Sequence, residues 1–329
     1  MRTKGSVPLT LPLFLRYMKN KSSFFRKIYV LCPLAILCCL LWGSAFPVIK
    51  IGYKTLDINS ADTASIILFA GCRFFLAGIF TVFIFTLIGK KFLLPKKSSY
   101  GKICVLSLFQ TVIQYLFFYL GLAHTTGVRA SVIDGLNVFF VLLISAFIFK
   151  QERFTVKKLV GCTFGFIGVA VAGGLFGGEF GSSINSGDLL LVFSALGYSF
   201  SSVFMKEFAK DDNPALLSGY QFILGGAVMS VVGFFMGGRI SFNIRGILIL
   251  LYLACVSAVA YSLWSILLKY NEVSSITVFS SFTPIFGFVL SYLLLGEENG
   301  NLLFNIIGLL LVVVGMSVLN VKRKAIGKS

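Results

Sequence analysis

Long apolar stretches recur along this chain, and short segments that hold most of its charged residues separate them. A hydrocarbon core about 30 Å thick is crossed by roughly 20 apolar residues in a helix. Ten stretches of about this length are present, at residues 28–49, 65–88, 103–122, 128–149, 158–175, 188–205, 215–236, 246–268, 273–295 and 303–320. They lack the alternation of apolar and polar positions that barrel strands need, and small residues recur in them as at close helix contacts. The pattern predicts an all-α integral membrane protein with ten transmembrane helices.

The two halves of the chain resemble each other in sequence. "GCRFFLAG" at 71–78 reappears as "GYQFILGG" at 219–226, an offset of 148 residues that places Arg73 opposite Gln221. Further matches are "WGSAFPVIK" at 42–50 with "YSFSSVFMK" at 198–206, and Gly161 and Gly168 with Gly308 and Gly315. Because each half holds five helices, an odd number, the second half is expected to cross the membrane in the opposite sense. Such inverted repeats are the architecture of many secondary transporters.

Charge distribution predicts the organisation and orientation of the chain. A first five-helix repeat at 28–175 and a second at 188–320 are flanked by basic tails at 1–27 and 321–329. Of the 29 Lys and Arg residues, 23 fall in the tails and the even-numbered loops and five in the odd-numbered loops. The positive-inside rule therefore predicts that both tails are cytoplasmic and that the chain is a multi-pass protein of the cell membrane. The first apolar stretch lacks an A-x-A cleavage site and is expected to remain as helix one.

Composition excludes a soluble globular domain, because 57% of the residues are hydrophobic, 12% are charged and the mean hydropathy is +0.93. The net charge of +17 raises the possibility of a nucleic-acid partner, but the basic residues do not cluster on one folded domain. The expected partners are instead a small-molecule substrate and the lipid bilayer. The chain is expected to be a monomer or a weak homodimer, with its N-terminal tail either lying on the anionic leaflet or only setting topology.

Motifs for metal binding or enzymatic chemistry are absent from the sequence. The seven cysteines show no C-x-x-C spacing, and His124 is the only histidine, so neither a metal nor a cofactor is expected. H-E-x-x-H and G-x-S-x-G are missing, and the terminal "GKS" has lysine where a P-loop needs its first glycine. The sequence therefore predicts a protein that is not an enzyme. Glu152, Glu297 and Glu298 are expected at helix ends as solvated groups or partners of nearby basic side chains.

The stretch "LLWGSAFPVIK" at 40–50 places a polar notch and a proline inside a hydrophobic helix. Pro47 lacks an N–H, and its ring clashes with the carbonyl near Gly43, so a kink with unpaired backbone groups is expected there. Irregular backbone is tolerated in a membrane only inside protein or beside a water-filled cavity. Two interpretations remain open: a packing kink with Trp42 filling the core, or a wall of a cavity.

Two ionisable residues lie inside the apolar stretches, Arg73 and Asp134. A charge at this position costs about 2.5 to 3.5 kcal/mol on insertion scales, so each suggests a function. Counted from the cytoplasmic ends of their helices at 1.5 Å per residue, both lie at about 25 Å, in the outer third of the membrane. Either they form a structural ion pair between helices two and four, or both face the outer vestibule and hold a zwitterionic or charged solute.

Uncharged polar residues form a second pattern. Gln110 and Gln114 lie four residues apart on helix three, and an offset of 147 relates them to Ser257 and Tyr261 on helix eight. Each polar group alone is explained as contact between helices, worth roughly 0.6 kcal/mol, whereas the symmetric set suggests a pocket with aromatic walls. The candidate substrate-binding residues are Trp42, Arg73, Gln110, Gln114, Asp134, Asn137, Tyr198, Tyr261, Trp264 and Thr283.

Four segments carry a resemblance to a known family: "LLWGSAFPVIK", "GCRFFLAG", "FKQERFTVKKLVGCTFGFIGV" at 149–169 and "FTPIFGFVLSYLLLGEE" at 282–298. From residue 28 onward the chain resembles the EamA-like branch of the drug/metabolite transporter superfamily. It departs from the pattern at "NVFF" (137–140), where the usual proline of helix four is replaced, although Pro284 is present in helix nine. The resemblance implies a ten-helix transporter, often an exporter of amino acids or other small amphipathic metabolites, with a central cavity. The substrate does not follow from the fold.

The sequence thus favours a secondary transporter that exports a small metabolite by alternating access of two inverted repeats. An importer of the same fold is the first alternative. A channel, a membrane scaffold or an intramembrane enzyme remains as an alternative of another class.

Overall fold

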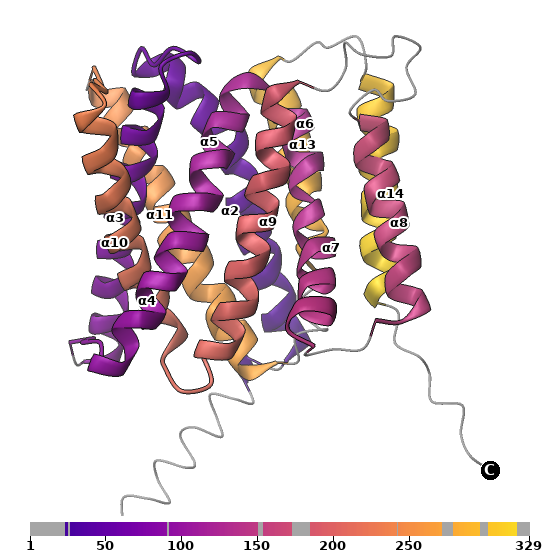
Figure 1. Cartoon of the computed structure of the whole chain (residues 1–329), viewed down its shortest axis with the longest axis horizontal. Helices are drawn as coiled ribbons and strands as arrows, with labels where there is room; N and C mark the ends of the chain where they lie inside the picture. The colour runs from indigo at the N-terminus through magenta and orange to yellow at the C-terminus, as the bar shows by residue number, and fades with distance from the viewer. Residues whose placement is uncertain are drawn as a thin grey trace, which may run out of the picture.

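The computed structural model is a bundle of helices (Figure 1). It describes residues 24–25, 27–90, 92–150, 154–172, 185–241, 243–271, 279–296 and 302–320. Nearly all of the two basic tails, together with Glu152, Glu297, Glu298 and residues 273–278 of the ninth predicted helix, lies outside the described residues. All regular secondary structure within the described ranges is helical.

The first repeat begins with α2 (Ile28–Thr55) and α3 (Thr63–Gly89). The short 3-10 helix η1 (Lys97–Ser99) leads into the third helix, which consists of α4 (Tyr100–Leu106), the π-helical segment η2 (Ser107–Ile113) and α5 (Gln114–His124). The fourth helix consists of α6 (Gly127–Asp134), α7 (Leu136–Leu143) and the π-helical η3 (Ile144–Ile148), and α8 (Val156–Ala172) is the fifth. The second repeat comprises α9 (Ser186–Phe208), α10 (Pro214–Phe235), α11 (Ile244–Tyr270), α13 (Phe282–Leu295) and α14 (Leu302–Asn320).

Polar residues in the loops define where several helices begin. The Asp62 side chain accepts a hydrogen bond from Ser65 N at 3.0 Å at the start of α3. Interaction with the Ser65 side chain and then with the Ser65 backbone N–H holds the pKa of Asp62 below its usual value. Asn185 and Asp188 form a reciprocal capping box at the start of α9. The apolar stretches therefore begin as helices where side chains satisfy the first backbone N–H groups.

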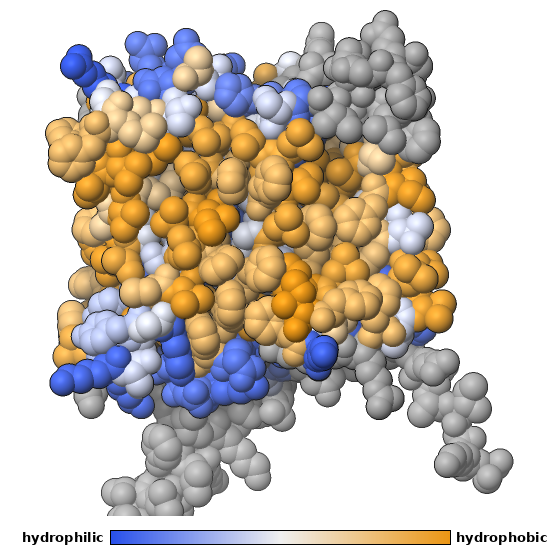
Figure 2. Space-filling view, in the orientation of Figure 1, coloured by the Kyte–Doolittle hydropathy of each residue, from blue (hydrophilic) through white to orange (hydrophobic). Residues whose placement is uncertain are grey.

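The length and surface of the helices confirm the prediction of a membrane protein. Among the described residues, eight helical segments are long and apolar enough to cross a bilayer, and α8 and α13 are shorter. Figure 2 shows a broad hydrophobic band across the face in view, between hydrophilic residues at its upper and lower edges. Large apolar side chains such as Phe235, which is 81% exposed, lie on this outer surface, as expected where lipid rather than water is the solvent.

The two repeats run in opposite senses. In Figure 1, α2 starts at the lower end of the bundle and α9, its counterpart, starts at the upper end. We use "lower end" and "upper end" in this sense. The last turn of α14 also lies at the lower end, so the described chain begins and ends on the same side. The predicted fold, ten helices in two inverted repeats, is confirmed.

Glycine contacts join helices that the sequence repeat relates. Between α3 and α10, a Cβ built on Gly226 would lie 2.2 Å from Phe75 N, and one on Gly71 would lie 2.3 Å from Ser230 N. Between α8 and α14, a Cβ on Gly168 would lie 2.6 Å from the carbonyl oxygen of Gly308. Real Cβ atoms do not approach backbone so closely, so these pairs of helices depend on glycine to pack.

Helix α2 is not interrupted at the notch that the sequence displays. It runs as one helix through Pro33 and Pro47 to Thr55. A Cβ on Gly43 would lie 2.6 Å from Phe286 Cβ and 2.9 Å from Gly287 N, so this glycine allows α13 to pack closely against α2. The Ser44 hydroxyl donates to Leu41 O at 2.7 Å and lies 2.7 Å from the Tyr252 hydroxyl. The polar notch thus serves packing, whereas Trp42 beside it faces a cavity.

Candidate substrate cavity between the two repeats

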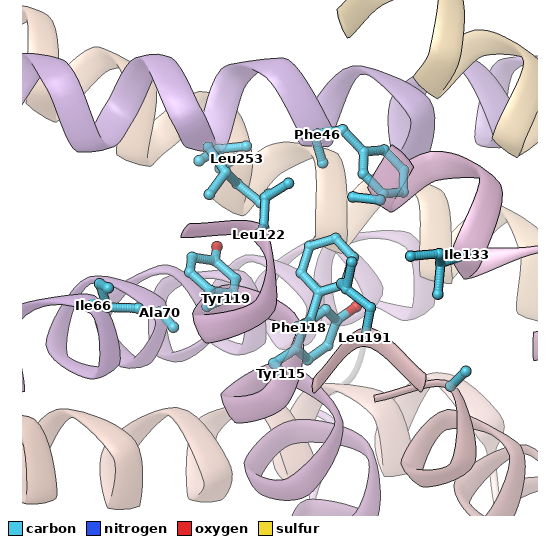
Figure 3. Packing of buried hydrophobic residues seen from close by; sticks show 14 of the residues in the cluster. Phe46, Ile66, Ala70, Tyr115, Phe118, Tyr119, Leu122, Ile133, Leu191 and Leu253 are labelled. Atoms are coloured by element: carbon cyan, nitrogen blue, oxygen red, sulfur yellow. The ribbon is translucent and has the colours of Figure 1, made fainter. Parts of the chain in front are cut away.

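A cavity of about 110 Å³ lies between the repeats, within a core rich in aromatic residues. Because one water needs roughly 10 to 15 Å³ on this measure, the space holds several water-sized groups. Its lining residues come from both repeats and are Trp42, Ala45, Phe46, Arg73, Gln114, Tyr115, Phe118, Asp134, Gly135, Asn137, Val138, Tyr198, Tyr261, Trp264, Ser280, Thr283, Pro284 and Met316. Figure 3 shows Phe118 of α5 beside Phe46 of α2, with Tyr115 next to Phe118 and Tyr119 on the side toward Ile66 and Ala70 of α3. All the candidate residues chosen from the sequence line the cavity except Gln110.

Arg73 of α3 is 3% exposed and is held by groups from both repeats. Its Nη1 donates to the Tyr119 hydroxyl at 2.7 Å, and its guanidinium carbon lies 4.9 Å from the centre of the Phe74 ring. From α11, the Leu253 carbonyl oxygen accepts from Nε at 3.2 Å and Ser257 Oγ accepts from Nη2 at 3.0 Å. Within the described part of the chain, the hydrogen-bond acceptors on Arg73 are therefore all neutral oxygens. The guanidinium is oriented by these contacts but its charge is not neutralised by them.

Asp134 is the last residue of α6 and is only partly buried, because its side chain borders the cavity. Its Oδ1 accepts a hydrogen bond from Asn137 Nδ2 at 2.7 Å across the junction between α6 and α7. Among the described residues, Asp134 forms no ion pair with Arg73. The structural ion pair considered from the sequence is thus not formed, and both charges face the same cavity instead.

Aromatic rings from α2 and α11 form one wall of the cavity. The Trp42 ring lies edge to face against Trp264 at 5.2 Å and against Tyr261 at 5.4 Å between centroids. The hydroxyls of Tyr115 and Tyr261 are hydrogen-bonded at 2.7 Å, which ties α5 to α11 at this wall. Offset or perpendicular rings of this kind offer an apolar surface on which an aliphatic or aromatic group packs well.

Three polar atoms on the cavity lining are buried without a hydrogen-bond partner among the described residues: Trp42 Nε1, Gln114 Oε1 and Asn137 Oδ1. A buried polar group left without a partner costs roughly 1 to 3 kcal/mol. Because Asn137 donates through Nδ2 to Asp134, its oxygen is the atom left over. Together these atoms offer one donor and two acceptors to whatever occupies the cavity.

Gln110 lies away from the cavity in a network between helices. Its Oε1 accepts from Gln221 Nε2 of α10 at 3.2 Å, and the Thr111 hydroxyl donates to Gln221 Oε1. Gln110 and Gln114 are both buried, but of the two only Gln114 lines the cavity, and Gln110 lies in the π-helical segment η2. Gln221 matches Arg73 in the repeat, so the bond from Gln221 to Gln110 is the counterpart of the bond from Arg73 to Ser257.

Several lining residues were not predicted from the sequence, although a signal for two of them exists. Phe46 lies four residues after Trp42 and Phe118 four after Gln114, each on the cavity face of its helix. Ser280 and Met316 carry no such signal. The described residues contain no group of three or more His, Cys, Asp or Glu side chains that would hold a metal ion.

Charged clusters lie at both ends of the bundle. At the upper end, Asp188 of α9 forms an ion pair with Arg129 of α6 and accepts from the Thr125 hydroxyl at 2.7 Å. Lys50 Nζ of α2 donates to the Thr125 carbonyl oxygen at 2.6 Å. At the lower end, Lys102 Nζ lies 2.8 Å from Asp212 in the loop between α9 and α10. Each cluster connects elements of the first repeat to the second.

Comparisons with known proteins agree with this architecture. A family model described as the EamA-like transporter family matches residues 31–174 and 185–321. An uncharacterized transporter from Archaeoglobus fulgidus is 27% identical over 295 residues, which cover 88% of this chain and 97% of that protein. A probable amino-acid metabolite efflux pump of Escherichia coli (strain K12) is 26% identical over 303 residues, which cover 86% of this chain and 92% of that protein.

A solved crystal structure, 19% identical in sequence, superposes with a TM-score of 0.61 over 87% of this chain and 94% of that chain, so the two share a fold. The family match carries more weight, because it extends over both repeats and hence over most of the chain. The protein therefore belongs to the EamA-like transporter family and is a multi-pass membrane transporter.

Proposed function

We propose that this transporter exports a small metabolite, an amino acid or a similar amphipathic solute, by alternating access of its two inverted repeats. The observation that carries the proposal is the cavity between the repeats, which combines an aromatic wall with Arg73, Asp134 and three buried polar atoms that lack partners. A scaffold or a lipid-facing packing defect has no need of such groups, because each is costly to bury unpaired.

Inverted symmetry supplies the mechanism. The repeats share a fold in opposite orientations, so two states related by exchange of their conformations have similar energies. In one state the cavity opens at the upper end and in the other at the lower end. The clusters around Asp188 and around Asp212 connect the repeats at those ends and serve as alternating closures. The substrate-binding set proposed from the sequence is retained without Gln110, whose contacts are with other helices.

Direction and location are part of the proposal. The relative named as a probable amino-acid metabolite efflux pump favours export of an amino acid or its relatives. The excess of Lys and Arg at the lower end favours a cytoplasmic location for both tails and insertion in the cell membrane. The protein is proposed to act as a monomer or weak homodimer in the bilayer, with the small-molecule solute as its ligand.

Counterflow into proteoliposomes tests the proposal. Vesicles containing the purified full chain are loaded with one unlabelled solute at a time from amino acids, their derivatives and organic cations, and entry of the labelled solute is followed. We expect saturable uptake that an internal load accelerates for at least one amphipathic solute. Flux that rises linearly with concentration would indicate a channel, and absence of exchange for every solute would contradict the proposal.

The matched control is Phe235→Ala on the lipid-facing surface of α10, which is expected to leave counterflow unchanged. Trp42→Ala, which removes a ring from the cavity wall, is expected to raise the apparent KM for the exchanged solute.

A further inference from the structure

Two opposite charges border one cavity, and neither is neutralised by a neighbour among the described residues. Arg73 donates to two hydroxyls and one carbonyl, and Asp134 accepts from one amide. A guanidinium has five N–H donors, so two of those on Arg73 remain beyond these three bonds. Because unpaired charges are costly to hold away from water, the cavity is built to receive groups that complement both.

The sequence repeat shows that the helical framework does not require these charges. At the offset of 148 that relates Arg73 to Gln221, and at the offset of 147 that relates Asp134 to Ser281, the second repeat has neutral residues. Gln221 occupies its position with its amide bonded to Gln110 and Thr111 between helices. The two charges are therefore specific to the first repeat. They give the cavity, which is otherwise symmetric between the repeats, one positive and one negative group.

The three polar atoms on the cavity lining that have no hydrogen-bond partner among the described residues comprise two acceptors and one donor. Asn137 Oδ1 and Gln114 Oε1 are acceptors, and Asn137 is bonded directly to Asp134. An ammonium group offers three N–H donors, which one carboxylate and two amide oxygens would satisfy. A carboxylate group would accept from the remaining N–H groups of Arg73, in a strong charge-assisted interaction. The rings of Trp42, Tyr261 and Trp264 offer the apolar surface for the rest of such a solute.

We infer that the cavity selects zwitterionic solutes of the α-amino acid type, with the solute carboxylate bound at Arg73 and its ammonium group at Asp134. This inference rests on the proposed function, transport through this cavity, and adds the charge state of the solute and the residues that determine it. A solute with only one of the two charges would leave the other protein charge in the cavity without an opposite charge beside it.

A panel of matched ligands tests the inference on the unaltered protein. Binding of alanine, leucine and methionine to the full chain in nanodiscs is measured by the shift in melting temperature with concentration. Each amino acid is compared with its amide, which keeps only the positive charge, and with its deaminated acid, which keeps only the negative charge. We expect at least one amino acid to bind about tenfold or more tightly than both of its analogues.

Two substitutions that copy the second repeat assign the roles. Arg73→Gln is expected to weaken binding of the amino acid about tenfold while leaving its amide within about twofold, because the amide has no carboxylate to lose. Asp134→Ser is expected to weaken the amino acid while leaving the deaminated acid unchanged. Phe235→Ala on the outer surface is the control and should change none of the three affinities. Equal loss of all three ligands in Arg73→Gln would mark a structural role and overturn the assignment.

The outcomes separate this inference from the proposed function. If other solutes undergo counterflow but no amino acid in the panel binds more tightly than its singly charged analogues, the charge assignment is overturned and transport stands. If no solute of any class undergoes counterflow, both are overturned. The ligand comparison needs no variant, so the inference remains testable even where Arg73→Gln fails to fold.

Discussion

Gln110 and Gln114 are the same residue type on one helix, four positions apart, and their surroundings differ completely. Gln110 is paired with Gln221, whereas Gln114 Oε1 is buried without a partner at the cavity. Removing one partner of a buried hydrogen bond costs roughly 1 to 3 kcal/mol, but removing an unpaired polar atom costs little. At these two positions, the contribution of the side chain to protein stability can therefore be separated from its contribution to solute binding.

The same substitution at both sites gives opposite expected results. Gln114→Leu should change the stability of the protein by less than about 1 kcal/mol and weaken solute binding by about threefold to tenfold. Gln110→Leu should lower stability by roughly 1 to 3 kcal/mol, because Gln221 loses its acceptor, and leave affinity nearly unchanged. Thermal unfolding and ligand titration of both variants check this. A large loss of stability in Gln114→Leu with normal affinity would contradict a solute-binding role.

Asp212 makes stability at the lower end depend on pH. Hydrogen bonds from Lys102 and Ser99 hold the pKa of Asp212 below its usual value. A carboxyl with a lowered pKa in the folded state contributes stability above its unfolded pKa, and that contribution is lost as the pH falls through the folded value. We therefore expect melting temperature to fall below about pH 4, and to fall less steeply in Asp212→Asn. Identical acid slopes in the two proteins would show that the cluster is not coupled to folding.

At the scale of elements, glycines set the distance between α3 and α10. A Cβ on Gly226 would lie 2.2 Å from a backbone nitrogen of α3, which no rotamer change relieves. Gly226→Ala is therefore expected to destabilise the protein by about 1 to 3 kcal/mol or more, as in overpacked cores. Gly101 of α4 is the matched control, because nothing lies within 4 Å of its Cβ position. Gly101→Ala should stabilise the helix by roughly 0.5 to 1 kcal/mol. Melting temperatures of the two variants should move in opposite directions.

Hydropathy predicts the helices well, because the bilayer imposes their length, but it does not predict local changes within them. The predicted stretch 103–122 contains the π-helical segment η2, which arises where Thr111 and the neighbouring Gln110 bond to Gln221 on another helix. Arg73 and Asp134 were recognisable because charges are rare in apolar stretches, yet their lack of mutual pairing depends on how the helices are rotated. Rotation of a helix about its axis is set by packing partners that are distant in sequence, such as Phe286 against Gly43.

At the scale of the whole molecule, Arg129, which forms the ion pair with Asp188 of α9, lies on the same short helix, α6, that carries Asp134. Helix α6 spans only Gly127–Asp134, so movement of its first turn at the upper end displaces the cavity end as well. Lys50 likewise lies on α2, which carries Trp42 two turns below. Opening of the upper end is therefore expected to be coupled to the solute that the cavity holds.

Asp188→Asn tests this coupling, because it removes the charge that attracts Arg129 while keeping an amide able to cap α9. A single cysteine at position 114, in a chain whose seven native cysteines are replaced, reports access to the cavity. We expect an impermeant thiol reagent added at the upper end to label it about threefold to tenfold faster in the variant, because loss of a charge-assisted hydrogen bond shifts a two-state equilibrium by about that factor or more. Asp212→Asn, which weakens the lower end instead, should slow the same labelling. Equal rates in all three proteins would mean that these clusters do not close the cavity.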